Sequence, residues 1–260
     1  MSENTPFLQE LTEIVSLLRV YRVYDENGLI PLRRLGKDYD GGYIVPEKAL
    51  QVADVVMGYG IGETHDSSFE EMSSEVYQKR SYGFDGSVAM DKISHPLFHF
   101  TPIYIIGNDH MKTSGGVPTK HSSFDEHLEI FHLQDKKIFV KMDIEGNEYA
   151  TLPDILRYTP QITGITFEMH FAGMGEETKA LQLLKQFQKD YLLVHLHGHN
   201  FSPKFQAPNA QGEIPRLMEL SYINKNLVKH FEISDNQKHP TALDMPCDPR
   251  GPDSNFEILI

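Results

Sequence analysis

The sequence predicts an α/β protein, built on a doubly wound, mostly parallel sheet with helices on both faces. Strand-like apolar runs alternate with helical patterns over residues 50–200, as they do along chains that form parallel sheets. One apolar run, residues 52–57, leads directly into a turn that holds Gly58, Gly60 and Gly62. A second short run ends in Asp85. A strand, a glycine-rich turn and an acid at the end of the next strand are typical of doubly wound sheets.

The length and composition fit one globular unit. The chain has 260 residues, of which 40% are hydrophobic and 23% charged, so it can bury a full core. We expect a helix and a hairpin from residues 1–48 to pack on a core domain of residues 49–260. No apolar run approaches the roughly 20 residues that span a bilayer, so we expect no membrane segment.

The charge balance limits the partners. The net charge is −13, and no block is rich in lysine or arginine. Proteins that bind nucleic acid neutralise phosphates with cations, so we expect a small neutral or cationic partner and no nucleic acid. Cys247 is the only cysteine, which favours a reducing compartment. Because the first residues also lack the pattern of a secretory signal, we expect a cytoplasmic protein.

Two elements precede the glycine-rich turn. Apolar residues recur at helical spacing over residues 7–21, which predicts an amphipathic helix at the edge of the sheet. Residues 32–45 contain two short apolar runs on either side of an Asp-Gly-Gly turn, which predicts a hairpin. Asp40 and Tyr43 then either belong to an ordinary turn or face a ligand from a flap.

The glycine-rich turn and Asp85 together predict a nucleoside ligand. Glycines in the turn let backbone N–H groups approach a ligand closely. A carboxylate at the end of the neighbouring strand can accept two hydrogen bonds from a ribose diol. Either feature alone would be a weak indication.

The remaining elements follow in alternation. We expect helices at residues 67–79, 123–133, 149–157 and 176–190, and strands at residues 98–106, 137–142, 162–169, 191–197, 217–223 and 256–260. Ser67 and Glu70 have the spacing of a capping box, so we expect Glu70 only to cap its helix. Ser122 or Ser123 should begin the second of these helices.

Polar residues gather where the predicted strands end. The carboxyl ends of parallel strands share one edge of the sheet, and ligands bind there, near the point at which strand order reverses. Besides the glycines, these ends carry Asp85, Asn108, Asp109, Asp143, Glu145, Glu168, His170, His197, His199 and Asn200.

Several of these segments resemble the successive motifs of FkbM-type S-adenosylmethionine-dependent methyltransferases, and the likeness covers roughly residues 30–225. The motifs are DGGYIVP, GYGIGETHDSSFE, YGFDGSV, KIFVKMDIEGNEYATL, TFEMHF and HLHGHN. The KMDIEGNEY block and the DGGY hairpin are the most specific of them. One departure is His199, which stands where the family pattern has asparagine.

The resemblance implies a class I methyltransferase fold, Rossmann-like, with a seven-stranded sheet whose last strand is antiparallel. It implies methyl transfer from S-adenosylmethionine to a hydroxyl of a small molecule or glycan. We expect the cofactor to contact Gly58, Gly60, Gly62, Asp85, Asn108 and Asp143. We expect the acceptor to contact Asp40, Tyr43, Glu145, His197 and Asn200.

Methyl transfer to oxygen requires an aligned acceptor and a group that removes its proton. Asp143 and His170 are the candidate catalytic bases, although His170 could equally be a satisfied residue at a strand exit. Asp143, Glu168 and His170 could instead hold a divalent metal such as Mg²⁺. His195, His197 and His199 would share one face of an extended strand, which is either a solvated face or part of the acceptor pocket.

Two alternatives remain open at this point. One is a protein of the same fold that binds the nucleoside, or nothing, and serves as a regulatory module without catalysis. The other is a nicotinamide oxidoreductase. It is disfavoured because Glu63 stands where the third glycine of the dinucleotide fingerprint would fall.

Overall fold

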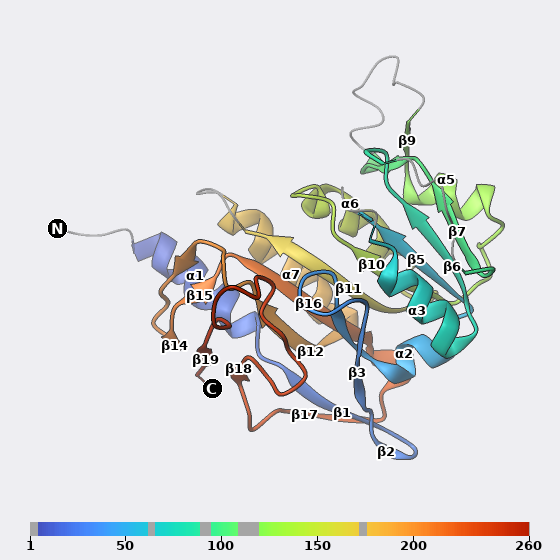
Figure 1. The fold of residues 1–260 in the computed structure, drawn as a ribbon. Coiled ribbons are helices and arrows are strands. Elements are labelled where there is room, and N and C mark those ends of the chain that lie inside the picture. The colour runs from blue at the N-terminus through green and yellow to red at the C-terminus, as the bar shows by residue number, and fades with distance from the viewer. Residues whose placement is uncertain (1–4, 62–65, 89–94, 109–119, 172–175, 260) are drawn as a thin grey trace.

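A computed structural model describes residues 5–61, 66–88, 95–108, 120–171 and 176–259. Its centre is a seven-stranded sheet (Figure 1). In spatial order the strands are β12 (Tyr191–Gly198), β16 (Leu217–Asn224), β11 (Ile162–His170), β10 (Ile138–Met142), β5 (Val55–Tyr59), β6 (Arg80–Phe84) and β7 (Phe98–Thr101). Neighbours pair in parallel except β16, which runs antiparallel between β11 and β12. The predicted α/β architecture with a mostly parallel sheet is confirmed.

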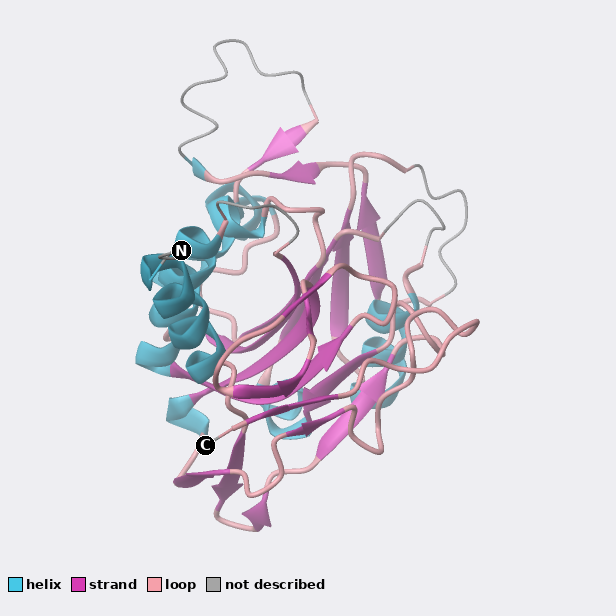
Figure 2. Ribbon diagram, turned by 90° about the vertical axis from the view of Figure 1, so that its left-hand side faces the viewer, coloured by secondary structure: helices cyan, strands magenta, loops and turns pink. Residues whose placement is uncertain are grey.

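Helices lie on both faces of this sheet (Figure 2). One face packs against α1 (Thr5–Leu17), α5 (Phe124–Ile130), α6 (Glu148–Ile155) with the short η1 (Leu156–Tyr158), and α7 (Glu177–Asp190). The other face packs against α2 (Glu47–Val52) and α3 (Ser68–Tyr77). The strands are therefore buried on both sides, which explains their nearly continuous apolar runs.

Local sequence explains why two of these helices form where they do. Ser123 begins α5 as a capping box, because its hydroxyl accepts from the Glu126 N–H while the Glu126 carboxylate accepts from the Ser123 N–H. Along α7, apolar residues at helical spacing face the sheet. The ring of Phe187 stacks there on Tyr222, at a centroid distance of 4.3 Å, and on Phe167, at 5.3 Å.

The first helix is shorter than the periodicity predicts. It ends at Leu17, and Tyr21 instead begins β1 (Tyr21–Asp25). This strand pairs with β17 (His230–Ile233) on one side and β2 (Gly28–Leu29) on the other. The apolar side chain of Tyr21 that continued the helical pattern meets Phe231 edge to face, so a cross-strand contact replaced the expected helical one.

The predicted hairpin is confirmed. It consists of β3 (Leu32–Leu35) and β4 (Tyr43–Pro46), which pair antiparallel. Every residue of β4 is buried, and the strand lies against β16, β12 and β11. The hairpin therefore covers the same face of the sheet as α2 and α3.

Short strands complete the fold. They are β8 (Tyr104–Ile105), β9 (His121–Ser122), β13 (Lys204–Phe205), β14 (Ala210–Gly212), β15 (Ile214–Pro215), β18 (Lys238–His239) and β19 (Phe256–Ile258), with the turn η2 (Lys225–Leu227) after β16. The strand expected at residues 98–106 is thus divided into β7 and β8. The C-terminal segment, residues 235–259, folds back beside β14 through β19.

The expectation that Glu70 only caps its helix is wrong. Ser67 precedes α3, but its side chain accepts no cap hydrogen bond. Glu70 is instead fully buried beside Gly58, where a Cβ would lie 1.8 Å from Glu70 Oε1. Gly58 thus makes room for a carboxylate in the core. Burial raises the pKa of Glu70 from its usual 4.5 to about 7, although the nearby charge of Lys141 opposes the shift.

This environment predicts a pH-dependent effect of Glu70→Gln. Between pH 4.5 and 7 the folded state holds a proton that the unfolded state releases, so Glu70 lowers the free energy of unfolding as pH rises. The full cost, about 3 kcal/mol, is present above pH 7. The stability of the variant relative to wild type should therefore increase between pH 5 and 8 in urea unfolding. Glu75→Gln, an exposed change in the same helix, is the control, and a flat difference for Glu70→Gln contradicts the prediction.

Candidate active site

A cavity of about 520 Å³ opens at the carboxyl ends of the central strands. Its wall includes Gly60 after β5, Asp85 after β6 and Asp143 after β10. The chain leaves β5 toward β6 on one side, while β10 pairs with the other side of β5. This is the point where strand order reverses, which is the usual ligand site of doubly wound sheets.

Gly60 sits where the chain allows no side chain. Its φ is +79°, and a Cβ would lie 1.5 Å from the Asp143 carbonyl oxygen. The Gly60 N–H donates to the Phe84 carbonyl at 3.0 Å. Lys141 Nζ donates to the Gly60 carbonyl at 2.5 Å. The turn is therefore fixed to both neighbouring strands. Gly62, the third glycine of the predicted loop, lies outside the described residues.

Asp85 links the glycine-rich turn to the loop after β6. Its Oδ2 accepts from the Ile61 N–H at 2.9 Å, and its Oδ1 accepts from the Ser87 N–H at 2.8 Å and the Ser87 hydroxyl at 2.6 Å. The side chain is largely buried in the cavity wall. These bonds fix the orientation of the carboxylate in the cavity wall.

The far wall of the cavity was not anticipated from the sequence. It is formed by Tyr104, Ile105, Ile106 and His121, and the rings of Tyr104 and His121 stack at a centroid distance of 5.3 Å. Tyr104 and Ile105 belong to β8, His121 belongs to the paired strand β9, and Ile106 directly follows β8. Flat and apolar side chains suit a heteroaromatic base. The only signal in the sequence was an apolar run in the predicted strand at residues 98–106.

Two hydrogen bonds hold Asp143 in place, one through its backbone and one through its side chain. Its N–H donates to the Tyr59 carbonyl at 2.9 Å, and its Oδ2 accepts from the Tyr43 hydroxyl at 3.2 Å. Burial and then the charge of Asp143 raise the pKa of Tyr43 well above its usual value, so this hydroxyl stays a donor. Tyr43 is only 2% exposed and meets Lys141, whose Nζ lies 5.2 Å from the ring centroid. The expected contact of Tyr43 with the site is therefore made through Asp143.

His170 lies among three carboxylates. Its Nε2 is 3.2 Å from Glu145 and 3.3 Å from Glu168, and its Nδ1 is 3.2 Å from Glu148. Burial lowers the pKa of His170, but the hydrogen bond and charge of Glu148, with the charge of Glu168, outweigh it and raise the pKa to about 9. At neutral pH this imidazole is therefore positively charged, and the three carboxylates are its partners. The alternative of a satisfied residue at a strand exit thus has a structural basis.

The three residues predicted as metal ligands do come together. One donor atom each of Asp143, Glu168 and His170 lies within 4.8 Å of the others. Burial raises the pKa of Glu168 to about 8, against the opposing charge of His199. Glu145, predicted to contact the acceptor, lies at the exposed mouth of the cavity and faces His170. The set offers two carboxylates and an imidazole, which suit a hard or borderline divalent ion.

Three predicted site residues lie elsewhere. Asp40 is exposed in the turn of the hairpin. Asn108 is not among the described residues that line the cavity, and its side chain donates to Asp125. Asn200 donates to the Asp248 carbonyl and accepts from the Asp248 N–H, both at 2.9 Å. Its amide, expected to contact an acceptor, instead anchors the C-terminal segment through these two bonds.

The histidines near the end of β12 are not on a solvated face. His195, His197 and His199 are at most 3% exposed. His195 and His197 pair in register with Ser221 and Glu219 of β16, beneath the C-terminal segment. His197 is therefore not in the cavity with Asp143. Sequence reasoning missed its partners Glu219, Cys247 and Asp253, because they are distant in sequence and only the fold brings them together.

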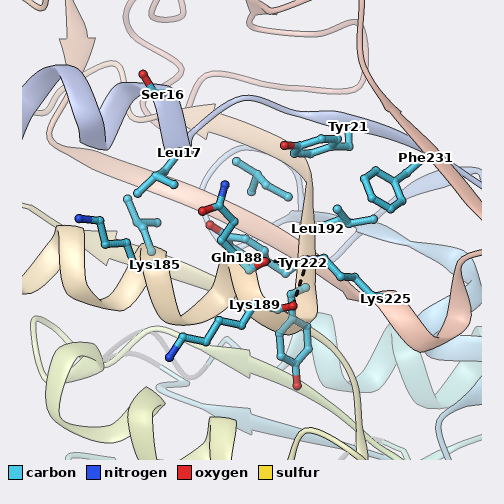
Figure 3. A pocket seen from close by; sticks show the side chains of 13 residues that line it. Ser16, Leu17, Tyr21, Lys185, Gln188, Lys189, Leu192, Tyr222, Lys225 and Phe231 are labelled. Carbon is cyan, nitrogen blue, oxygen red and sulfur yellow. Dashed lines mark hydrogen bonds between the residues drawn. The ribbon is translucent and has the colours of Figure 1, made fainter.

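A second pocket, of about 370 Å³, lies at the opposite edge of the sheet, where β12 begins and α7 ends (Figure 3). The Lys225 amine there donates to the carbonyls of Gln188 and Lys189. The pocket is lined by Ser16, Leu17, Tyr21, Leu184, Lys185, Gln188, Lys189, Tyr191, Leu192, Leu193, Tyr222, Lys225 and Phe231. Since it lies away from the edge where carboxylates and histidines converge, we assign no chemistry to it.

Comparisons with known proteins give little further guidance. No helix in the described part of the chain is long and apolar enough to cross a membrane. The sequence matches no protein-family model and no curated protein. Among solved structures, bluetongue virus VP4, described as a multifunctional RNA-capping production line, aligns with 10% identity and a TM-score of 0.33. The alignment covers 92% of this chain and 34% of VP4, and a likeness this low supports no inference.

Proposed function

We propose that this protein is an S-adenosylmethionine-dependent methyltransferase that acts on a hydroxyl of a small molecule or glycan. The observation that carries the proposal is the cavity at the reversal of strand order, with Gly60 at its floor between Asp85 and Asp143. The antiparallel seventh strand β16 also agrees with the class I fold that the sequence motifs imply. Neither feature depends on whether Asp143, Glu168 and His170 bind a metal ion.

The cavity residues fit such a cofactor. Gly60 lines the cavity without a side chain, Asp85 offers carboxylate oxygens for a ribose diol, and the Tyr104 and Ile105 side offers a surface for the base. When bound, S-adenosylmethionine supplies an electrophilic methyl group on a sulfonium. The protein then has to orient the acceptor hydroxyl and take its proton.

Asp143 is the stronger of the two candidate bases. It lines the cavity, and the Tyr43 hydroxyl fixes its orientation. His170, with its pKa raised to about 9, is protonated at neutral pH and accepts no further proton. In that state it stabilises the charge that accumulates on the neighbouring carboxylates. It becomes a base only when it loses this proton.

A divalent metal is the second way to activate the hydroxyl. Asp143, Glu168 and His170 would hold it, and an ion such as Mg²⁺ would lower the pKa of a bound hydroxyl. A metal would also displace the proton from His170. The alternative of a regulatory module without catalysis predicts ligand binding, or none, with no turnover.

Ligand binding tests the proposal directly. S-adenosylmethionine and its demethylated product should raise the melting temperature, and NAD should not. Asp85→Asn keeps an acceptor for the Ile61 N–H but removes the charge, so affinity for both ligands should fall by about 10-fold or more in calorimetric titration. Asp54→Asn, the same change at the opposite edge of the sheet, is the control. Stabilisation by NAD alone would overturn the proposal. An unchanged melting temperature with all three ligands would favour the non-catalytic module.

Turnover tests the role of Asp143. With labelled S-adenosylmethionine and a panel of sugar and polyketide hydroxyls, wild-type protein should transfer methyl groups to at least one acceptor. Asp143→Asn should lower kcat by about 100-fold or more, because it removes the carboxylate and retains the size of the side chain. Cofactor binding should change little. Unchanged turnover in the variant rejects the assignment.

Chelation tests the metal alternative. If Asp143, Glu168 and His170 hold a divalent ion, exhaustive EDTA treatment should abolish methyl transfer and added Mg²⁺ or Mn²⁺ should restore it. Glu168→Gln should then require more metal for the same rate. Persistent activity after EDTA treatment shows that the protein alone activates the hydroxyl.

A further inference from the structure

A second cluster of metal-binding side chains lies apart from the cavity, beneath the C-terminal segment. It joins His197 near the end of β12, Glu219 of β16 and Cys247 of the C-terminal segment, and all three are buried. Their donor atoms converge. His197 Nδ1 is 3.5 Å from Glu219 Oε2, and Cys247 Sγ is 4.0 Å from both His197 Nδ1 and Glu219 Oε1.

These separations suit an ion between the groups better than bonds among them. They lie at or beyond the long end of hydrogen-bond distances. A tetrahedral zinc ion holds nitrogen and oxygen at about 2.0–2.2 Å and sulfur at about 2.3 Å, so donors around it are roughly 3.3–3.6 Å apart. The observed separations exceed these values by less than about half an ångström, which small side-chain movements can close.

His199 gives an independent indication of a ligand. It is only 1% exposed, and neither ring nitrogen has a hydrogen-bond partner among the described residues. Its Nε2 lies 3.5 Å from Glu219 Oε1 and 3.5 Å from Glu168 Oε2. These distances are long for hydrogen bonds, and a buried imidazole that makes no hydrogen bond is costly. A metal ion bound to Glu219 could also bind His199 Nε2, which would give the imidazole a partner and the ion a fourth donor.

The surroundings of His197 also match a metal ligand. Its other ring nitrogen, Nε2, lies 3.1 Å from both carboxylate oxygens of Asp253. A carboxylate on the far nitrogen of a ligating histidine fixes the tautomer and orients the ring toward the metal. Asp253 is itself held, since its Oδ1 accepts from the Ser254 N–H at 2.8 Å.

We propose that His197, Glu219 and Cys247, with His199 as the fourth donor, bind a structural zinc ion. A thiolate, imidazoles and a carboxylate form a borderline-soft donor set that selects zinc over magnesium. With four protein donors the site is closed, so its role is to join the C-terminal segment to the ends of β12 and β16. The proposal does not depend on the methyltransferase proposal, which concerns different residues.

The single cysteine makes the test specific. Untagged protein purified without chelator should contain about one zinc per chain. After exchange with Co²⁺, it should show the near-ultraviolet absorption of a cobalt–thiolate bond, to which only Cys247 can contribute. Cys247→Ser should lose this absorption and most of the zinc. Asp253→Asn should keep the absorption but bind zinc about 10- to 100-fold more weakly.

His239→Gln is the matched control, because His239 is another buried histidine near the cluster but not one of its donors. It should retain zinc and the cobalt spectrum. The absence of thiolate absorption from wild-type Co²⁺ protein overturns the proposal, as does full zinc content in Cys247→Ser. If Cys247→Ser fails to fold, the wild-type cobalt spectrum decides alone. Titration with S-adenosylmethionine remains a separate readout for the other site.

Discussion

The contact between the ends of β5 and β10 constrains the rest of the site. Gly60 approaches the Asp143 carbonyl so closely that any Cβ would overlap it. This approach places the turn after β5 against the first residue after β10, and the Asp85 carboxylate holds the same turn from the β6 side. The absence of a side chain at Gly60 therefore lets these two strand ends meet at the wall of the cavity.

A second constraint is electrostatic. The face of the sheet beneath the hairpin and the C-terminal segment carries buried ionisable groups on four adjacent strands, namely Lys141, Glu168, Glu219 and His197. Isolated charges at such depth would be strongly destabilising. Here the carboxylates of Glu168 and Glu219 lie between imidazoles. Lys141 donates to the Gly60 carbonyl and lies over the Tyr43 ring. The arrangement explains why a chain of net charge −13 can bury several acids in one region.

Sequence reasoning found what local pattern encodes. The alternation of strands and helices, the hairpin and the convergence of Asp143, Glu168 and His170 all follow from periodicity and from residues at strand ends. It missed what depends on distant segments. Glu70 matched a capping motif but was drawn into the space beside Gly58. Asn200 donates a hydrogen bond to the C-terminal segment. Cys247 contacts Glu219 of β16, the strand that is inserted antiparallel in the sheet.

Glu168 belongs to the group with Asp143 and His170 and also contacts His199 of the proposed zinc site. One of its oxygens lies 3.3 Å from His170 Nε2, and the other lies 3.5 Å from His199 Nε2. A change of charge on either imidazole is thus felt by a shared neighbour in a medium that screens poorly. The two groups form one electrostatic unit, and ionisation constants measured for it describe the whole unit and no single residue.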